Sequence, residues 1–65
     1  MPKPVNISII HKNDDPDLFA GFDEEWVVVA SNEDGAFDPT FCHTYSEAKD
    51  VVSEFAGYYG IIKIV

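Results

Sequence analysis

The chain has 65 residues but no arginine, and its only basic side chains are four lysines. Without arginine it lacks the rigid guanidinium fork that binds a phosphate or carboxylate in two places. Its 12 acidic side chains give a formal net charge of −8, and a field of that sign repels nucleic acids and anionic membranes. Composition therefore disfavours direct binding to DNA, RNA or membranes and favours a basic partner.

Cysteine and long apolar runs are also scarce. The single cysteine, Cys42, excludes an internal disulfide and is typical of a reducing compartment. No apolar run approaches the roughly 18 residues of a membrane-spanning helix, and no basic segment followed by an apolar one resembles a secretory signal. We therefore expect a cytoplasmic protein.

The length predicts one domain over residues 1–65, and the 46% hydrophobic content is ordinary for a folded chain. A domain of this size buries only about 60% of the surface that its unfolded chain exposes. A cofactor cavity of several hundred cubic ångströms would take up much of such a core. We expect no cofactor, and a protein that binds a partner and is not an enzyme.

The first half of the chain has the alternation and the turn residues of a β-sheet. Residues 5–12 alternate as in a half-buried strand, whereas residues 26–31 are apolar on both faces, as in a central strand. Residues 13–21 are rich in turn-forming types and predict a loop. Residues 32–35 predict a hairpin turn, with Asp34-Gly35 as its characteristic pair.

The second half predicts a strand, a helix and a last strand. Pro39 interrupts the strand predicted over residues 36–43, because a proline removes a backbone donor and marks an edge or a bulge. Thr44 to Glu47 reads T-x-x-E, the capping box of a helix N-terminus. Either Gly57 or Gly60 ends the helix, and residues 61–65 predict a buried strand. The apolar helix face, spaced by three and four, comprises Ala48, Val51, Val52, Phe55, Ala56 and Tyr59.

The predicted order is β-β-β-α-β, an α+β fold. A helix with one apolar face needs a sheet to cover it, so we expect one three- to four-stranded sheet with the helix packed on one face. The last strand follows a helical crossover and could run parallel to the third strand in a right-handed unit.

Acidic residues are concentrated between residues 13 and 38, where there is no lysine. The block is either a solvated surface or a functional field, since surfaces that serve solubility usually mix both signs. In the second interpretation carboxylates stand where phosphates would stand, and a basic groove built for nucleic acid accepts the protein. The block comprises Asp14, Asp15, Asp17, Asp23, Glu24, Glu25, Glu33, Asp34 and Asp38.

Apolar residues lie inside this acidic region. Phe19 and Phe22, with Leu18, either tuck into the core or form an apolar anchor ringed by acids, as in a binding hot spot. Tyr58 lies off the apolar helix face and would suit an interface. The acids Glu47, Asp50 and Glu54 fall opposite that face, where we expect solvent.

No constellation of residues predicts chemistry. The DDPD segment (residues 14–17) fails the spacing of a calcium loop and predicts a turn. Cys42 and His43 are neighbours on an extended segment, so their side chains point to opposite faces and cannot form a dyad. His11, at a strand end, is expected to be exposed, and one cysteine with two histidines lacks zinc spacing. We expect no metal.

The size, the charge and the one-sign block resemble small acidic phage-encoded inhibitors, such as anti-CRISPR and anti-restriction DNA mimics. That resemblance implies a basic, nucleic-acid-handling target in the host cytoplasm. The order β-β-β-α-β and HTYSEA (residues 43–48) are similar to the N-terminal domain of HicB-type antitoxins, although the leucine-proline-glycine-cysteine stretch of that family is missing.

Three hypotheses result, and the third, an enzyme or metal protein, is the least favoured because no spaced constellation of residues supports it. In the first, the chain inhibits a basic partner. The contact residues are those of the acidic block other than Asp38, together with Phe19 and Phe22. In the second, it is an antitoxin-like or assembly module that binds through a sheet edge or the Phe19/Phe22 patch, with a homodimer as one form.

Overall fold

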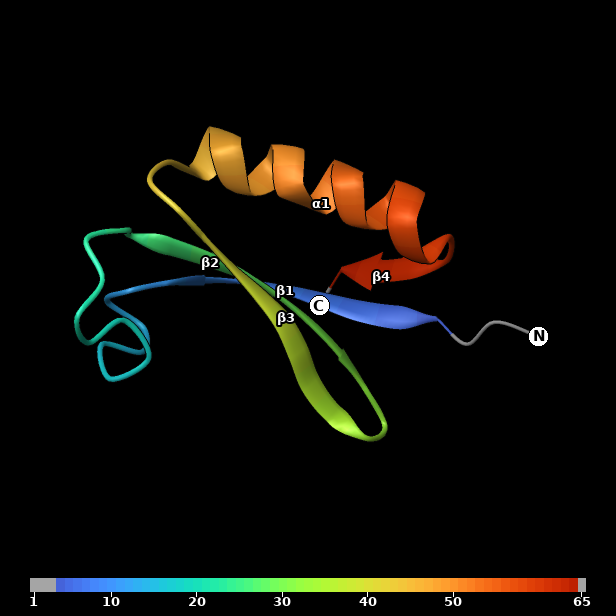
Figure 1. Cartoon of the computed structure of the whole chain (residues 1–65), viewed down its shortest axis with the longest axis horizontal. Helices are drawn as coiled ribbons and strands as arrows, with labels where there is room; N and C mark the ends of the chain where they lie inside the picture. The colour runs from blue at the N-terminus through green and yellow to red at the C-terminus, as the bar shows by residue number, and fades with distance from the viewer. Residues whose placement is uncertain (1–3, 65) are drawn as a thin grey trace.

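The computed structural model describes residues 4–64, and over these residues a four-stranded mixed sheet carries one helix on one face (Figure 1). The predicted α+β class and the order β-β-β-α-β are confirmed. The sheet order is β3-β2-β1-β4, with β1 antiparallel to β2, β2 antiparallel to β3 and β4 parallel to β1. The elements are β1 (Val5–His11), β2 (Trp26–Asn32), β3 (Gly35–Cys42), α1 (Tyr45–Tyr59) and β4 (Ile62–Ile64).

Strand β2 lies inside the sheet, as its continuous apolar run predicts. Val28 faces the helix and belongs to the main core, whereas its neighbour Val27 points to the opposite face and is also fully buried. Val27 pairs with Phe41 of β3, and Phe41 contacts the rings of Phe19 and Phe22. The loop between β1 and β2 therefore covers part of the sheet face that α1 leaves open.

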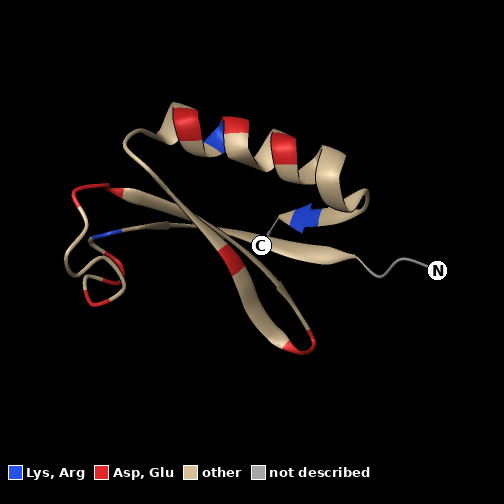
Figure 2. Ribbon diagram, viewed as in Figure 1, with Lys and Arg blue, Asp and Glu red and all other residues tan. Residues whose placement is uncertain are grey.

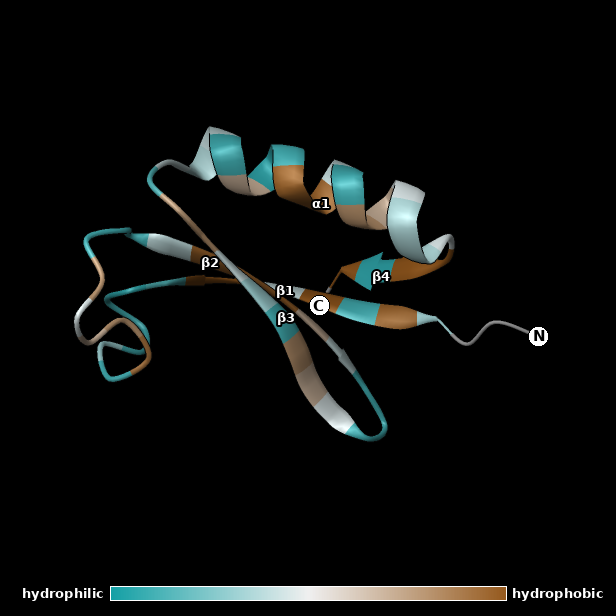
Figure 3. Ribbon diagram, in the orientation of Figure 1, coloured by the Kyte–Doolittle hydropathy of each residue, from teal (hydrophilic) through white to brown (hydrophobic). Residues whose placement is uncertain are grey.

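Helix α1 packs its apolar face on the sheet, and its polar face points away from it (Figure 3). Ala48 and Phe55 are buried in the cluster that also holds Ile7 of β1. Half of the predicted capping box is present, because the Thr44 hydroxyl accepts a 3.1 Å hydrogen bond from the Glu47 amide, which the helix itself leaves unpaired. The Glu47 carboxylate accepts a 3.1 Å hydrogen bond from the amide of His43, the residue before the N-cap, and not from that of Thr44.

The helix ends at Gly60, one of its two predicted ends. Gly60 has φ 84°, and its amide donates to the Ala56 carbonyl at 3.0 Å. This left-handed backbone favours glycine, which has no Cβ to clash with the following carbonyl.

Strand β3 is an edge strand with a bulge at Asp38 and Pro39, as predicted from the proline. Thr40 pairs with Val28 and Phe37 with Ala30, so two residues of β3 lie opposite one residue of β2. Asp38 has φ 56°, the left-handed region that aspartate tolerates better than most side chains. Pro39 takes the place where no ladder donor is needed.

The prediction that Asp34-Gly35 is the central pair of the hairpin turn was wrong. The hairpin turn is centred on Glu33 and Asp34, and Gly35 already pairs with Asn32. The Asn32 side chain accepts a 2.8 Å hydrogen bond from the Asp34 amide, which tightens the turn locally. Gly35, with φ 126°, then starts β3 in a conformation that other residues rarely adopt.

The last strand pairs with β1 and not with β3, through the register Val5↔Ile62 and Ile7↔Ile64. The bulge and Pro39 make the outer edge of β3 a poor template for another strand, whereas β1 offers a free edge. The prediction of a buried last strand was wrong over its described residues, because β4 is itself an edge. Lys63 is exposed and Ile64 is 55% exposed, and Val65 lies outside the described residues.

Candidate protein-interaction site

The acidic block separates in space into two groups at opposite ends of β2 (Figure 2). One group lies in the loop before Trp26, and the other, Glu33 and Asp34, lies at the hairpin tip after Asn32. Seven strand residues at about 3.3 Å each put roughly 20 Å between the groups. The block is therefore not one patch, and Glu33 and Asp34 do not share a surface with the loop acids.

The helix start, in contrast, lies beside the loop acids. The Glu25 amide donates to the Cys42 carbonyl at 3.2 Å, and the Glu47 carboxylate accepts from the next residue, His43. Burial raises the pKa of the Cys42 thiol, and the nearby charges of Glu47 and Glu24 raise it further. Carboxylates from the loop and from the helix thus act on the same sulfur.

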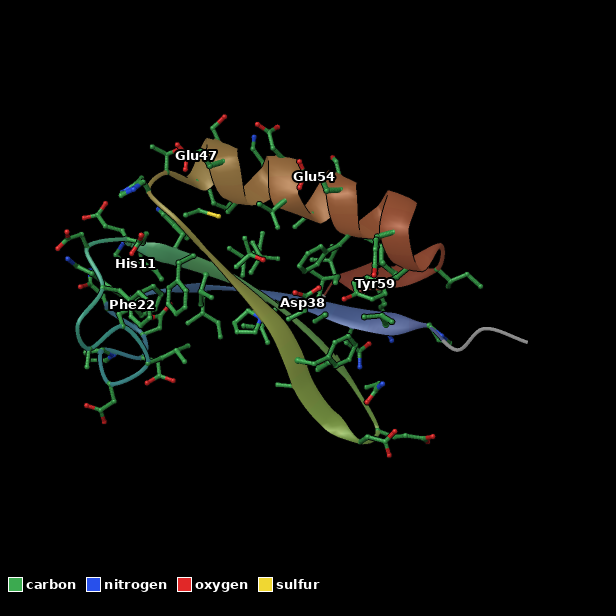
Figure 4. All side chains as sticks on the ribbon, viewed as in Figure 1. His11, Phe22, Asp38, Glu47, Glu54 and Tyr59 are labelled. Carbon is green, nitrogen blue, oxygen red and sulfur yellow. The ribbon has the colours of Figure 1, made fainter. Side chains whose placement is uncertain are left out.

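These contacts join Glu24, Glu25 and Glu47, and the other loop acids lie at the same end of the molecule, which we name the acidic end (Figure 2). Figure 4 shows Glu47 at the same end of the molecule as His11 and Phe22. Glu47, assigned from the sequence to a solvated helix face, is the residue that this interpretation missed. Its position near the loop acids depends on the pairing of Trp26 with Cys42, a contact between residues distant in the sequence. The acidic end comprises Asp14, Asp15, Asp17, Asp23, Glu24, Glu25 and Glu47.

The loop that carries the acids is held by its own hydrogen bonds. The Lys12 amide donates to the Glu25 carbonyl at 2.9 Å and closes the loop at its base. The Asp15 side chain accepts from the Leu18 amide at 3.4 Å, and the Phe19 amide donates to the Pro16 carbonyl at 3.2 Å. The DDPD segment is thus the start of a hydrogen-bonded turn, with Asp15 in a capping role.

The two phenylalanines of the loop have different positions. Phe19 is only 4% exposed and meets the Phe41 ring edge-on at 5.4 Å, so it is a core residue. Nearly all of the Phe19 ring is covered by its own domain, which leaves it only a small surface for contact with a partner. Phe22 is 50% exposed and stacks on Phe41, with 4.1 Å between the ring centroids and 6° between the planes.

A hollow of about 280 Å³ opens inside this loop, lined by Lys12, Asn13, Pro16, Phe19 and Phe22. Pockets for small molecules and cofactors usually measure about 300–1,000 Å³. The hollow therefore lies at the lower end of that range and has room for a side chain of another protein.

An aromatic row borders the acidic end on the helix side of the sheet. His11 was expected to be exposed, but it is half-buried, with its ring 4.6 Å from that of Trp26, and its Nδ1 accepts from the Asn13 amide. The Trp26 ring lies 5.0 Å from that of Tyr45, and the Lys49 ammonium lies 5.4 Å from the Tyr45 centroid. The row gives the acidic end a rigid flank.

Asp38 stands apart from the acidic end. Its carboxylate accepts a 2.6 Å hydrogen bond from the Tyr59 hydroxyl and ties the β3 bulge to the end of α1 (Figure 4). This bond, with help from desolvation, raises the pKa of Tyr59 to about 12. Asp38 therefore has a structural role.

Within residues 4–64, no group of three or more His, Cys, Asp or Glu side chains is placed to hold a metal ion. Cys42 is buried with a raised pKa, so little reactive thiolate forms near neutral pH. What the acidic end can do is attract cations, above all the lysines and arginines of another protein.

No protein-family model, curated protein or solved structure gives a significant match to this chain. The part of the chain that the structure describes contains no helix long and apolar enough to cross a membrane.

Proposed function

We propose that this chain is an inhibitor that occupies a basic, nucleic-acid-binding surface of a partner protein in the cytoplasm, as a DNA mimic would. The observation that supports it is the acidic end, where carboxylates of the loop and of the helix start lie at one end of the molecule on a hydrogen-bonded scaffold. A predominantly acidic field of this kind steers a basic partner toward it and speeds association. Salt weakens such attraction, because the Debye length is only about 8 Å at physiological ionic strength.

The separation of the acidic block sharpens this proposal. We assign the contact to the acidic end, and the hairpin acids, roughly 20 Å away along β2, lie outside it. This arrangement provides a matched pair of variants with equal loss of charge. The loop variant is Asp14→Asn with Asp17→Asn, and the hairpin variant is Glu33→Gln with Asp34→Asn.

The experiment is capture of a partner from a lysate of the source cell on immobilised protein, with elution by a salt gradient. We expect a basic nucleic-acid-binding protein to elute at moderate salt, to be displaced by added DNA or RNA, and to bind the loop variant more weakly than the hairpin variant. A bound protein that is not eluted by high salt and is not displaced by nucleic acid would contradict the proposal. Equal binding by the two variants would also contradict it.

We propose assembly through the β4 edge as a second candidate function, because apolar side chains gather there. Ile61 is 51% exposed, Ile64 is 55% exposed and the nearby Tyr58 is 81% exposed. A short edge strand with exposed apolar neighbours can pair with a second copy or with a partner strand. Sedimentation at increasing concentration tests the homodimer. A dimer that Ile64→Asp abolishes would support it, and a strict monomer would exclude it.

A further inference from the structure

The hollow in the acidic loop is formed before any partner arrives. Phe22 is half exposed, yet its ring is fixed by the stack on Phe41, and its amide donates to the Phe19 carbonyl at 2.9 Å. Phe19 is held edge-on against the same Phe41 ring. Binding to such a preformed site loses less conformational entropy than binding to a flexible loop.

The chemistry of the hollow differs from that of its surroundings. Three of its five lining residues, Pro16, Phe19 and Phe22, are apolar, and its one charged lining residue is the cation Lys12. The acids of the same loop are exposed around it: Asp14, Asp15, Asp17 and Asp23. A lysine or arginine entering the hollow would meet Lys12, whereas one lying outside it would meet carboxylates.

We infer that the hollow binds one apolar side chain of the partner, and that basic residues on both sides of that side chain pair with the surrounding acids. The inference rests on the proposed function, since it specifies the chemistry of the basic segment that the acidic end recognises. Charge complementarity with the surrounding acids favours a basic segment, and Pro16, Phe19 and Phe22 in the lining favour an apolar central side chain. An apolar anchor inside a charged rim is the usual arrangement of a binding hot spot.

The two parts of the contact respond differently to salt. Pairing between basic residues and the acids weakens as ionic strength rises. Burial of an apolar side chain against Phe19 and Phe22 does not weaken in this way, because it depends on the area removed from water. The ratio of the affinity of a peptide with an apolar central residue to that of a peptide without one should therefore be the same at every salt concentration.

The probes are heptapeptides with blocked ends, three lysine or arginine residues on each side, and glycine, leucine or tryptophan at the centre. Binding is followed by amide chemical shifts of the isotope-labelled full chain at low and high salt. We expect the leucine and tryptophan peptides to bind about tenfold or more tightly than the glycine peptide. The ratio should be unchanged by salt, and the central side chain should shift the amides of residues 12–22.

Phe22→Ala should reduce the affinity ratio of the leucine or tryptophan peptide to the glycine peptide to near one, while the affinity of the glycine peptide stays as before. Tyr58→Ala is the matched control, since it removes an aromatic ring that is 81% exposed on the helix, and the ratio should persist. The shift map on the unaltered chain tests the site even if Phe22→Ala unfolds.

The outcomes separate this inference from the function on which it rests. If all three peptides bind equally, or if the central side chain shifts amides elsewhere, the hollow is not an anchor site. The proposed binding of a basic partner to the acidic end is then unaffected. If no peptide binds at low salt, the proposed function is overturned and this inference falls with it.

Discussion

The hydrogen bond between Tyr59 and Asp38 should stabilise the domain measurably. It is short, at 2.6 Å, its acceptor is a carboxylate, and it joins the β3 bulge to the last turn of α1. Because it lies near solvent, we assign it the ordinary net value of about 1 kcal/mol and not the larger value of buried charged pairs. Tyr59→Phe should therefore lower the free energy of unfolding by about 1 kcal/mol, or the Tm by about 4–8 °C for a domain of this size.

Asp38→Gly tests the same bond from the other partner. It removes the acceptor, but it also relieves the left-handed backbone at φ 56°, which costs a non-glycine residue about 1–2 kcal/mol. The single variant should thus be nearly neutral. In a double-mutant cycle the backbone effect occurs in both glycine variants and cancels, so the coupling energy should be about 1 kcal/mol.

Urea unfolding followed by fluorescence is the assay, because Trp26 is the only tryptophan and lies half-buried between His11 and Tyr45. If Tyr59→Phe lowers stability equally in the native and Asp38→Gly backgrounds, the bond contributes nothing and the reasoning is refuted.

The pH dependence of the same bond has a definite sign. The folded pKa of Tyr59, about 12, lies above the ordinary tyrosine value of about 10. Its stabilising contribution is therefore complete below pH 10 and is lost as the pH rises toward 12. Wild type should lose more stability than Tyr59→Phe over this interval, and parallel pH profiles of the two proteins would contradict the assignment.

Three further predictions concern the acidic end, the helix cap and the cysteine. The loop variant should bind the glycine-centred basic peptide several-fold more weakly than the hairpin variant at low salt, and their affinities should converge at high salt; equal titrations would contradict this. Thr44→Ala should lower the free energy of unfolding by about 1 kcal/mol, seen in thermal melts, whereas Thr44→Ser should be nearly neutral. Cys42 should resist a thiol reagent in the native protein and react at once in urea, because burial and nearby carboxylates raise its pKa; rapid labelling of native protein would contradict its position.

Local signals in the sequence predicted most of the elements. The capping box needs only Thr44 and Glu47, three residues apart, and the apolar helix face follows from the 3.6-residue period. Pro39 predicted a bulge because its missing N–H cannot serve a ladder. Each of these signals depends on neighbours within a few residues, and the Thr44 cap, the apolar helix face and the bulge were confirmed.

The failures concern contacts between distant residues. Nothing near residues 61–65 states whether they pair with β1 or β3, because the choice depends on which edge is free after the bulge has formed. His11 was expected in solvent because its contact with Trp26 exists only after the two strands pair. The sequence likewise left the burial of Phe19 open, and it was decided by packing against Phe41.

The amino-acid sequence by itself determined the charge, the helix and the strands, since these follow from composition and short-range periodicity. The tertiary structure decided which acids share a surface. Seven residues of extended β2 carry Glu33 and Asp34 away from the loop acids, although they are close in sequence. Pairing of Trp26 with Cys42 brings the start of α1 next to those acids, because an antiparallel hairpin returns the chain to the level from which it left.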